Sequence, residues 1–418
     1  MSTKLPFLVI LLFILKYGIY NSRSNAFTLK ETTIDDLELA FKQNELTSRQ
    51  LVEFYLKQIH RLNPLLRGVI EVNTDALYLA DKADQDRKVK EPGLLPSLHG
   101  IPVLLKDNIA TKDKLNTTAG SYALFGSIVP RHAGKASLSE WAGSRSFKSL
   151  AGFCGRSCQG RNPYVLSASP CGSSSGSGIS VAANLAAVSL GTETGGSILC
   201  QSGGVNSVVG IKPTVGLTSR AGKSKLNKEI QTLLNGAGLS AALKYIRHGG
   251  YKQFLKQDRL KGKRLGIVIS PFFNFTDDEG SVLARAFENH IQTLRQNGAE
   301  EKLKEYGQDF FEKAESLNTT DDEYKGTLSK LHKYSRHRIE KVMRKYKVDA
   351  LVTPGAGGSP VLAIGGYPGF SVPAGYDSKG LPYGICFGGL KGTEPKLIEI
   401  AYGFEQATKI RKPPSFIP

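Results

Sequence analysis

SPCGSSSGSG at residues 169–178 and GTETGGSI at residues 191–198 are two turns rich in glycine and serine. The apolar run 179–190 lies between them and is predicted to form one helix of small residues, and VVGIKPT follows at residues 208–214. Glycine adopts positive φ angles and lets a backbone approach a ligand closely, so such turns can aim several N–H groups at one point. We expect the rest of the chain to be organised around this stretch.

A lysine upstream of these turns has the setting of a catalytic base. GIPVLLKDN at residues 100–108 predicts an apolar strand, 101–105, that delivers Lys106 at its end. An isolated lysine at the end of a strand is usually a surface residue. A buried lysine, however, loses its hydration and its pKa falls, so a neutral amine that can accept a proton becomes accessible. The two serine-containing turns that follow in the motif order favour a buried Lys106 over a lysine at the surface.

Taken in order, these four segments resemble the amidase signature family. That family carries GIPxxxKDx, then a GGSSGGS turn, then GTDxGGSI and GxKPT, and it includes fatty-acid amide hydrolase and the A subunit of glutamyl-tRNA amidotransferase. The resemblance covers most of residues 30–220 and resumes over residues 340–418. It implies an α/β amidase signature fold, in which helices cover both faces of a central mixed β-sheet.

The resemblance also implies a Lys–cis-Ser–Ser triad, made here of Lys106, Ser173 and Ser197. In the family the second serine attacks the amide carbonyl, and the first relays its proton to the neutral lysine. Four consecutive backbone N–H groups would form the oxyanion hole, namely those of Thr194, Gly195, Gly196 and Ser197. The implied activity is hydrolysis of the C–N bond of a small linear amide through an acyl-enzyme, without a metal or an organic cofactor.

The chain departs from the family pattern in several places. Cys171 and Ser175 stand where glycine is usual, and Gln201 stands where proline is common. Three segments of the family also lack a counterpart, before residue 134, after residue 221 and near residue 300. Losing a sheet strand leaves ladder partners unpaired and a gap in the core. The alternative interpretation is therefore a truncated, catalytically inactive amidase-like protein.

Other motifs are weaker. GSSSG at residues 172–176 matches the G-x-S-x-G elbow of α/β-hydrolases with Ser174 at its centre, but Pro170 argues against the strand that must precede an elbow, and no histidine follows His337. Residues 216–224 resemble a phosphate-binding loop, but five residues rather than four separate its glycines. An amidotransferase A-type subunit is a third possibility, which the N-terminal segment disfavours.

That N-terminal segment, residues 1–26, has the pattern of a secretory signal peptide. Lys4 supplies a positive charge, residues 7–15 are apolar, and SNA at residues 24–26 offers small residues for cleavage. Three N-glycosylation sequons fit this route, at Asn116, Asn274 and Asn318. We expect a secreted glycoprotein with no stable membrane span after cleavage, or alternatively a protein anchored by an uncleaved N-terminal segment.

The composition is that of a globular protein, with 418 residues of which 40% are hydrophobic and 22% charged. We expect one amidase domain over residues 27–418, with its signature core at residues 95–220. The net charge of +18 comes without a basic motif interleaved with aromatic residues, so we expect a solvated basic face and no nucleic-acid partner. The five cysteines indicate neither a disulfide framework nor a zinc site, although a single disulfide is compatible with the sequence. Nothing in the pattern predicts an oligomeric state.

Outside the motifs, capping boxes at Thr33 with Asp36 and at Thr47 with Gln50 predict the starts of two amphipathic helices. The second should end at Pro64. Further strands are expected at residues 69–72, 348–354, 363–373 and 384–387, and further helices at residues 75–90 and 398–406.

Overall fold

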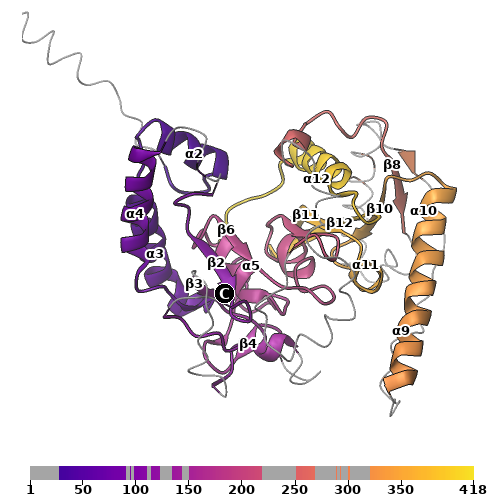
Figure 1. The fold of residues 1–418 in the computed structure, drawn as a ribbon, viewed down its shortest axis with the longest axis horizontal. Coiled ribbons are helices and arrows are strands. Elements are labelled where there is room, and N and C mark those ends of the chain that lie inside the picture. The colour runs from indigo at the N-terminus through magenta and orange to yellow at the C-terminus, as the bar shows by residue number, and fades with distance from the viewer. Residues whose placement is uncertain are drawn as a thin grey trace, which may run out of the picture. The chain divides into compact units, whose positions relative to one another are not determined.

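Figure 1 shows the fold in a computed structural model, which describes residues 28–90, 95, 98–110, 114–122, 134–143, 150–218, 251–268, 289, 292, 300–301 and 321–418. The predicted signal peptide and the sequons at Asn274 and Asn318 lie outside these residues. The chain divides into two compact units, Met1–Phe54 with Leu77–Ile101 and Tyr55–Ala76 with Pro102–Pro418. The predicted single domain over residues 27–418 stays a prediction.

The first unit is helical. It contains α2 (Ile34–Lys42), the first turns of α3 (Ser48–Leu66) and most of α4 (Ala76–Val89). Asp84 on α4 ties these helices together, because its carboxylate accepts hydrogen bonds from the backbone N–H groups of Ser48 and Arg49 at the start of α3. A carboxylate in this position satisfies N–H groups that have no partner within the helix.

Both predicted capping boxes are confirmed. The N–H of Asp36 donates to Thr33 Oγ1 over 3.1 Å, and the Asp36 carboxylate accepts from the N–H of Thr33 over 3.2 Å. At the start of α3, the N–H of Gln50 donates to Thr47 Oγ1 over 3.1 Å and Gln50 Oε1 accepts from the N–H of Thr47 over 2.8 Å. Local chemistry therefore sets where these helices begin.

The predicted end of α3 at Pro64 is wrong, because the helix continues to Leu66. Leu66 is fully buried, which favours one more helical turn despite the proline. Asn63 then fixes the exit of the chain, since its side chain accepts from the N–H of Val69 over 2.8 Å and donates to the Val69 carbonyl over 2.9 Å.

In the second unit, four short strands form a sheet in the order β1-β3-β2-β6. Their bounds are Val69–Glu71, Gly134–Ala136, Val103–Lys106 and Val188–Leu190. β2 is parallel to both β3 and β6, and Leu105 lies opposite Lys135 on one side and Leu190 on the other. α5 (Ser175–Ala182) packs against this sheet through the fully buried Ile179.

The prediction of one helix over residues 179–190 is wrong in both bounds. The helix α5 begins at Ser175 and ends at Ala182, and the rest of the run turns back and forms β6. Asn184 adopts a positive φ of 56° in this turn. A short apolar run has no periodicity that separates a helix from a buried strand, so the pairing of β6 with β2 could not be read from the run itself.

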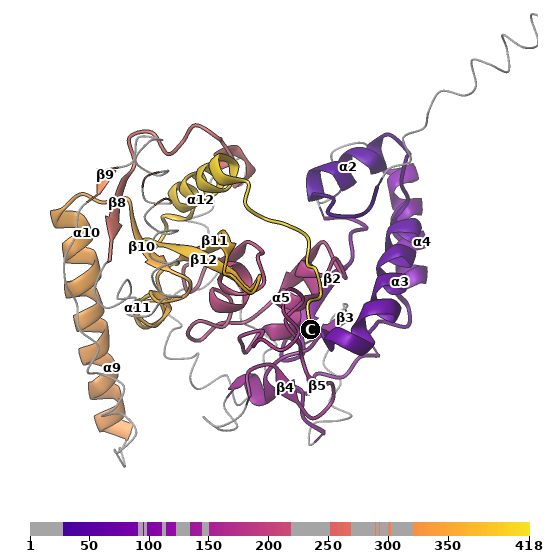
Figure 2. The same ribbon diagram turned by 180° about the vertical axis from the view of Figure 1, so that it is seen from behind.

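Six strands form a second sheet in the order β7-β11-β12-β10-β8-β9 (Figure 2). Their bounds are Gly210–Lys212, Gly369–Tyr376, Pro382–Gly388, Ala350–Pro354, Arg264–Ile267 and Glu300–Glu301. β10 is parallel to β8 and antiparallel to β12, so the sheet is mixed. The strand predicted over residues 363–373 is correct only from Gly369, because its first residues close helix α11 (Ser359–Gly365). A separate hairpin pairs β4 (Phe153–Cys154) with β5 (Cys158–Gln159).

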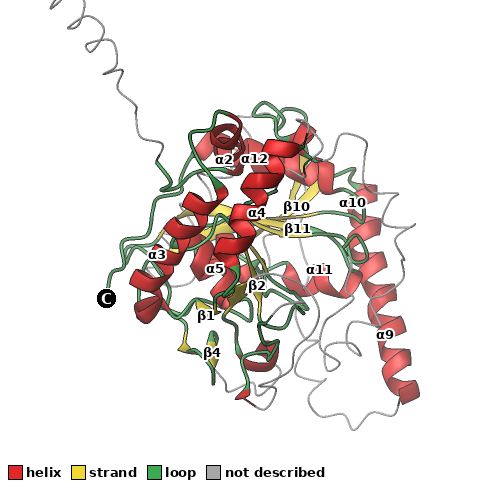
Figure 3. Cartoon of the chain, turned by 60° about the vertical axis from the view of Figure 1, so that its left-hand side comes forward, coloured by secondary structure: helices red, strands yellow, loops and turns green. Residues whose placement is uncertain are grey.

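Helices cover both faces of the six-stranded sheet, because successive side chains of a strand point to opposite faces. On β12, Ile385 and Phe387 pack with α12 (Glu394–Thr408), whereas Cys386 packs with Leu362 of α11 and Met343 of α10 (Lys341–Lys345). Helix α9 (Asp321–Ser335) and the turn η5 (Arg336–Glu340) lead into α10. Figure 3 shows these helices around β10 and β11. The predicted α/β class with a mixed sheet and helices on both faces is confirmed.

No helix within the described ranges is both long enough and apolar enough to cross a membrane.

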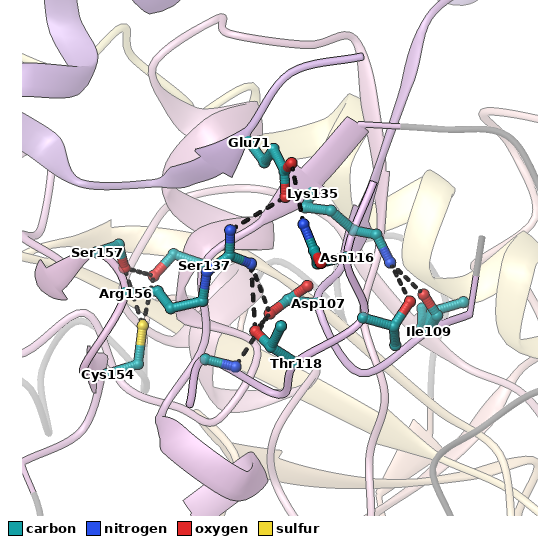
Figure 4. Close-up of polar contacts among 12 residues, drawn as sticks. Glu71, Asp107, Ile109, Asn116, Thr118, Lys135, Ser137, Cys154, Arg156 and Ser157 are labelled. Atoms are coloured by element: carbon teal, nitrogen blue, oxygen red, sulfur yellow. Dashed lines mark hydrogen bonds and ion pairs between the residues drawn. The ribbon is translucent and has the colours of Figure 1, made fainter. Parts of the chain in front are cut away.

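A network of charged side chains is buried just beyond the end of β2 (Figure 4). Asp107 Oδ2 accepts hydrogen bonds from Thr118 Oγ1 over 2.5 Å and from the N–H of Gly120 over 3.0 Å. The guanidinium of Arg156 lies 3.8 Å from Asp107 Oδ2 and 3.1 Å from Glu71 Oε2, so it forms ion pairs with two carboxylates. Burial raises the pKa of Asp107, while these hydrogen bonds and the nearby cations oppose the rise.

Lys135 completes the network on the neighbouring strand. Its side chain is fully buried, and its Nζ atom donates to the Ile109 carbonyl and to Thr117 Oγ1 over 2.8 Å each. The N–H of Ala119 donates to the Asp107 carbonyl over 3.1 Å. Together these contacts fix the backbone that follows Lys106, at Asp107 and Ile109.

Replacing Arg156 by methionine is expected to lower the free energy of unfolding by about 3 kcal/mol, because the Glu71 and Asp107 carboxylates lose their shared cation in a buried setting. Urea denaturation measures the change. Arg156→Lys is the control, since it keeps the charge, and it should lose less stability. A loss in the methionine variant that does not exceed that of the lysine variant would contradict this account of the network.

Candidate active site

Lys106 is the last residue of β2, and its side chain is completely buried. Its Nζ atom donates to Ser173 Oγ over 2.7 Å, to Ser174 Oγ over 3.0 Å and to Ser197 Oγ over 3.2 Å. The carbonyl oxygen of Thr192 lies 3.4 Å away. The structure therefore brings the three residues of the predicted triad together, with both predicted serines in contact with the buried amine of Lys106.

The two predicted serines also contact each other directly. Their Oγ atoms are 3.0 Å apart, and the peptide bond between Gly172 and Ser173 is cis. Ser197 Oγ accepts from the backbone N–H groups of Ser173 over 3.0 Å and Ser174 over 2.9 Å. A path of adjacent polar hydrogens thus leads from Ser197 through Ser173 to Lys106, which is the geometry that proton transfer requires.

Ser174, which the sequence placed only at the centre of a rejected elbow motif, is part of this cluster. Its side chain is fully buried, its Oγ atom lies 2.9 Å from Ser197 Oγ, and it donates to the Thr192 carbonyl over 2.9 Å. Although it precedes α5, its side chain makes no capping bond, so its hydroxyl turns toward the site. The run of serines in the motif was the available signal, but the sequence could not say which hydroxyls turn inward.

Glu193 holds the turn that carries Ser197, and it was not predicted as a site residue. Its carboxylate accepts hydrogen bonds from the backbone N–H groups of Gly196 over 3.0 Å, Ile198 over 2.6 Å and Leu199 over 3.0 Å. Hydrogen bonds to an ionised acceptor are stronger than neutral ones. The acidic residue within GTETGGSI was the available signal, since a carboxylate beside a glycine turn can close it in this way.

Of the four N–H groups predicted for the oxyanion hole, that of Gly196 is already bonded to Glu193. The other three belong to Thr194, Gly195 and Ser197, and for these the described part of the chain provides no hydrogen-bond acceptor. Thr194 and Gly195 are exposed, beside the buried Ser197. Three of the four predicted N–H donors, rather than all four, therefore have no acceptor in the described residues.

A disulfide between Cys171 and Cys200 joins the two serine turns, with the Cα atoms 6.2 Å apart. The sequence was compatible with a single disulfide, and the structure places it between these two cysteines. Cys171 has a φ of 56°, at a place where the family has glycine. This left-handed conformation costs a non-glycine residue about 1 kcal/mol. Cys154, Cys158 and Cys386 are free, and the described residues contain no group of three His, Cys, Asp or Glu side chains that could hold a metal ion.

Lys212 of the GIKPT segment supports the site from the second sheet. Its amine is buried and donates to the Tyr367 carbonyl over 2.5 Å. Burial lowers the pKa of Lys212, while the charges of Glu193 and Glu394 oppose that change. Burial likewise raises the pKa of the nearby Cys386 thiol to about 12. Lys212 is thus a buried amine, and its charged form interacts with the carboxylate that holds the Ser197 turn.

A buried lysine in contact with three serine hydroxyls, beside a glycine turn with N–H donors, defines the class of lysine–serine sites for acyl transfer. The amidase family profile matches residues 50–242. A probable amidase of Arabidopsis thaliana is 46% identical over 490 positions, which cover 94% of this chain and 93% of that protein. The chain belongs to the amidase signature family, as its motifs predicted.

Other relatives agree with this assignment. The X-ray structure of the native peptide amidase from Stenotrophomonas maltophilia superimposes with a TM-score of 0.79 and 32% identity, over 93% of this chain and 99% of that one. The A subunit of glutamyl-tRNA(Gln) amidotransferase from Thermoanaerobacter pseudethanolicus is 28% identical over 93% of this chain and 99% of its own length. The alignment with the Arabidopsis protein has 490 positions, more than the 418 residues here, so parts of that relative have no counterpart in this chain.

The lowered pKa of Lys212 predicts a contribution to stability that depends on pH. The unfolded chain keeps the Lys212 proton up to the ordinary pKa of 10.5, whereas the folded chain releases it at lower pH. In that window the unfolded state binds more protons, so stability rises with pH. Relative to Lys212→Met, the wild type should therefore gain free energy of unfolding as the pH approaches 10.5. Urea midpoints of both proteins across the alkaline range measure this, and a difference that stays constant with pH would contradict it.

Proposed function

We propose that this chain hydrolyses the C–N bond of a linear carboxamide, with Ser197 as nucleophile, Ser173 as proton relay and Lys106 as general base. The observation that carries the proposal is the contact path from Lys106 Nζ to Ser173 Oγ over 2.7 Å, and from there to Ser197 Oγ over 3.0 Å. Membership of the amidase family supports amide hydrolysis, and this path supports the assignment of roles.

In the acylation step, Ser197 Oγ attacks the carbonyl carbon of the amide. Its proton passes to Ser173 Oγ while the Ser173 proton passes to neutral Lys106, so Ser173 stays neutral, the lysine gains a positive charge and the carbonyl oxygen takes the negative one. The carbonyl oxygen becomes an oxyanion within reach of the N–H groups of Thr194, Gly195 and Ser197. When the C–N bond breaks, the lysinium returns a proton through Ser173 to the leaving amine.

Deacylation uses the same groups. A water molecule gives a proton to neutral Lys106 through Ser173 and attacks the Ser197 ester, and collapse of the second tetrahedral intermediate releases a carboxylic acid and restores the Ser197 hydroxyl. The Lys106 amine and the Ser197 hydroxyl are buried and Ser173 is partly buried, so bulk water has limited access to these hydrogen bonds. The net reaction consumes one amide and one water and needs no metal or organic cofactor.

Ser197→Ala is expected to abolish covalent labelling by a fluorophosphonate probe, because the probe's phosphorus needs the Ser197 oxygen. Gel fluorescence and intact mass measure the label. Ser189→Ala is the matched control, since Ser189 lies in the adjoining strand and donates only to the Ser177 carbonyl over 2.8 Å. The control should label as the wild type does. Full labelling of the alanine variant at position 197 would assign the nucleophile elsewhere.

Lys106→Met is expected to slow labelling and amide turnover by about 10²- to 10⁴-fold, the usual contribution of a general base. Ser197 itself is unchanged in this variant, so slow labelling at that residue should remain detectable by peptide mass spectrometry. Near-ultraviolet circular dichroism shows whether the variant is folded. A folded variant with the wild-type labelling rate would remove Lys106 from the mechanism.

The alternative is a folded amidase-like protein without turnover. One observation favours it, since the alignment with the Arabidopsis relative is longer than this entire chain. A purified chain that melts cooperatively, yet neither accepts the probe nor hydrolyses aliphatic, aryl or fatty amides, would establish this alternative. Turnover of any of these amides that disappears in Ser197→Ala would exclude it.

We further propose that the chain enters the secretory pathway. The signal-like residues 1–26 support this, and so does the Cys171–Cys200 bridge, because disulfides persist mainly in oxidising compartments. When the full chain is expressed in eukaryotic cells with a C-terminal tag, we expect tagged protein in the medium, shortened at its N-terminus and sensitive to an N-glycosidase. Unglycosylated protein in the cytosol would contradict the proposal, and glycosylated protein retained in membranes would indicate an uncleaved anchor.

A further inference from the structure

The Cys171–Cys200 disulfide links the two turns that carry the proposed catalytic serines. Cys171 is separated from Ser173 by one residue, and Cys200 is separated from Ser197 by two. We propose that this bridge is a positioning device for catalysis, which holds the hydroxyl of Ser173 at proton-transfer distance from that of Ser197. The inference rests on the proposed function of this site and assigns a role within it to two residues that the family motif does not include.

The covalent path makes the geometry easy to follow. From Ser173 the chain runs back to Cys171, crosses the bridge to Cys200 and returns to Ser197. The ring is closed by the 3.0 Å contact between the two serine Oγ atoms and by the hydrogen bond from the N–H of Ser173 to Ser197 Oγ, also 3.0 Å. Every other link of the ring is a covalent bond, so the bridge limits how far the two hydroxyls can separate.

The backbone on the Cys171 side needs such a restraint. Cys171 adopts a positive φ of 56°, a conformation that glycine takes more readily than cysteine. Its N–H donates to Ser169 Oγ over 3.2 Å, which is an exposed contact within the same turn. Without the bridge, this turn could relax toward an ordinary backbone conformation and carry Ser173 with it.

On the Cys171 side the Pro170 carbonyl accepts from the Asn206 amide over 3.1 Å and the Ser173 carbonyl accepts from the N–H of Ser139 over 3.0 Å, whereas the Cys200 side is anchored by more hydrogen bonds. The N–H of Cys200 donates to the Gly196 carbonyl over 2.8 Å, and Glu193 binds the N–H groups of Gly196, Ile198 and Leu199. The bridge therefore connects a firmly held turn, which carries the nucleophile, to a turn whose conformation is disfavoured. A displacement of about 1 Å in a catalytic group can cost roughly 10²-fold in rate, so the loss of this restraint should affect the chemical step.

Both bridged cysteines are partly exposed, so a reductant can reach the bond in the folded protein. A water-soluble phosphine breaks the Sγ–Sγ bond and yields two thiols. The phosphorus is oxidised to a phosphine oxide, and one water molecule supplies its oxygen and the two thiol protons. The protein chain is unchanged otherwise, and an oxidised glutathione buffer restores the bridge.

The existence of the bridge is tested first by peptide mapping without reductant. Between residues 162 and 220 trypsin has no site it cuts readily, because the lysine at 212 precedes a proline, whereas cleavage after Glu193 separates the two cysteines. Digestion with trypsin and a glutamate-specific protease should therefore give the fragments 162–193 and 194–220 as one linked species that phosphine separates. Free thiols at both cysteines in protein purified under oxidising conditions would overturn the inference.

The positioning role is tested by steady-state kinetics on an amide that the wild type hydrolyses, below the melting temperature of the reduced form. Reduction should lower kcat by about 10-fold and leave KM within about twofold, because the bridge acts on proton transfer rather than on binding. Reoxidation should restore kcat. Cys158→Ser, which removes an exposed free cysteine, is the control and should respond to the phosphine as the wild type does. In the variant C171A/C200A, kcat should be low from the start and insensitive to phosphine.

An unchanged kcat in reduced, folded protein would show that the bridge only stabilises the fold, and would overturn the inference. If the oxidised wild type neither accepts the fluorophosphonate probe nor hydrolyses amides, the proposed function fails. Hydrogen–deuterium exchange then still tests whether the bridge holds Ser173 against Ser197. Reduction should then speed exchange at the N–H groups of Ser173 and Ser174, which donate to Ser197 Oγ. Equal exchange in the oxidised and reduced forms would overturn the inference independently of any activity.

Discussion

The site depends on one constraint, the burial of the Lys106 amine among hydroxyl groups. An amine without exposure to water needs polar partners, and Lys106 finds them in Ser173, Ser174 and Ser197. Each of those serines must then be held where it can serve the amine. The glycine turns, the hydrogen bonds of Glu193 and the disulfide all act to hold these serines in place.

The topology explains why these groups meet. β2 and β6 are adjacent and parallel, and Leu105 lies opposite Leu190. The carboxyl ends of adjacent parallel strands lie at the same edge of a sheet, which is where ligand sites of such sheets form. Lys106 therefore emerges beside the segment that begins at Gly191, and the Thr192 carbonyl and the Ser197 turn follow within a few residues. A helix over residues 179–190, as predicted from the sequence, leaves no strand beside β2. The sequence prediction therefore did not show that Lys106 lies beside the segment that begins at Gly191.

Much of the candidate site could be predicted from the sequence because its chemistry lies in short motifs. The order of GIPVLLKDN, the two serine turns and GIKPT was enough to select Lys106, Ser173 and Ser197. Capping boxes likewise set the helix starts, since their hydrogen bonds join residues only three positions apart. Two of the missed parts depend on contacts across space, since the inward hydroxyl of Ser174 and the Cys171–Cys200 bridge are fixed by how two turns fold against each other. The acceptor role of Glu193 is local to its own turn, and the motif alone did not show which N–H groups its carboxylate binds.

The two sheets contribute different parts of the site. The four-stranded sheet supplies Lys106, the proposed base, at the end of β2. The turn with Ser197 instead runs into residues that pack on the six-stranded sheet, where Leu199 lies against Leu362 and Cys386. Lys212 on β7 adds a buried amine whose charged form interacts with Glu193, and it donates a hydrogen bond to the Tyr367 carbonyl before β11. In the described residues, the Oγ atoms of Ser173 and Ser197, the proposed relay and the proposed nucleophile, lie 3.0 Å apart.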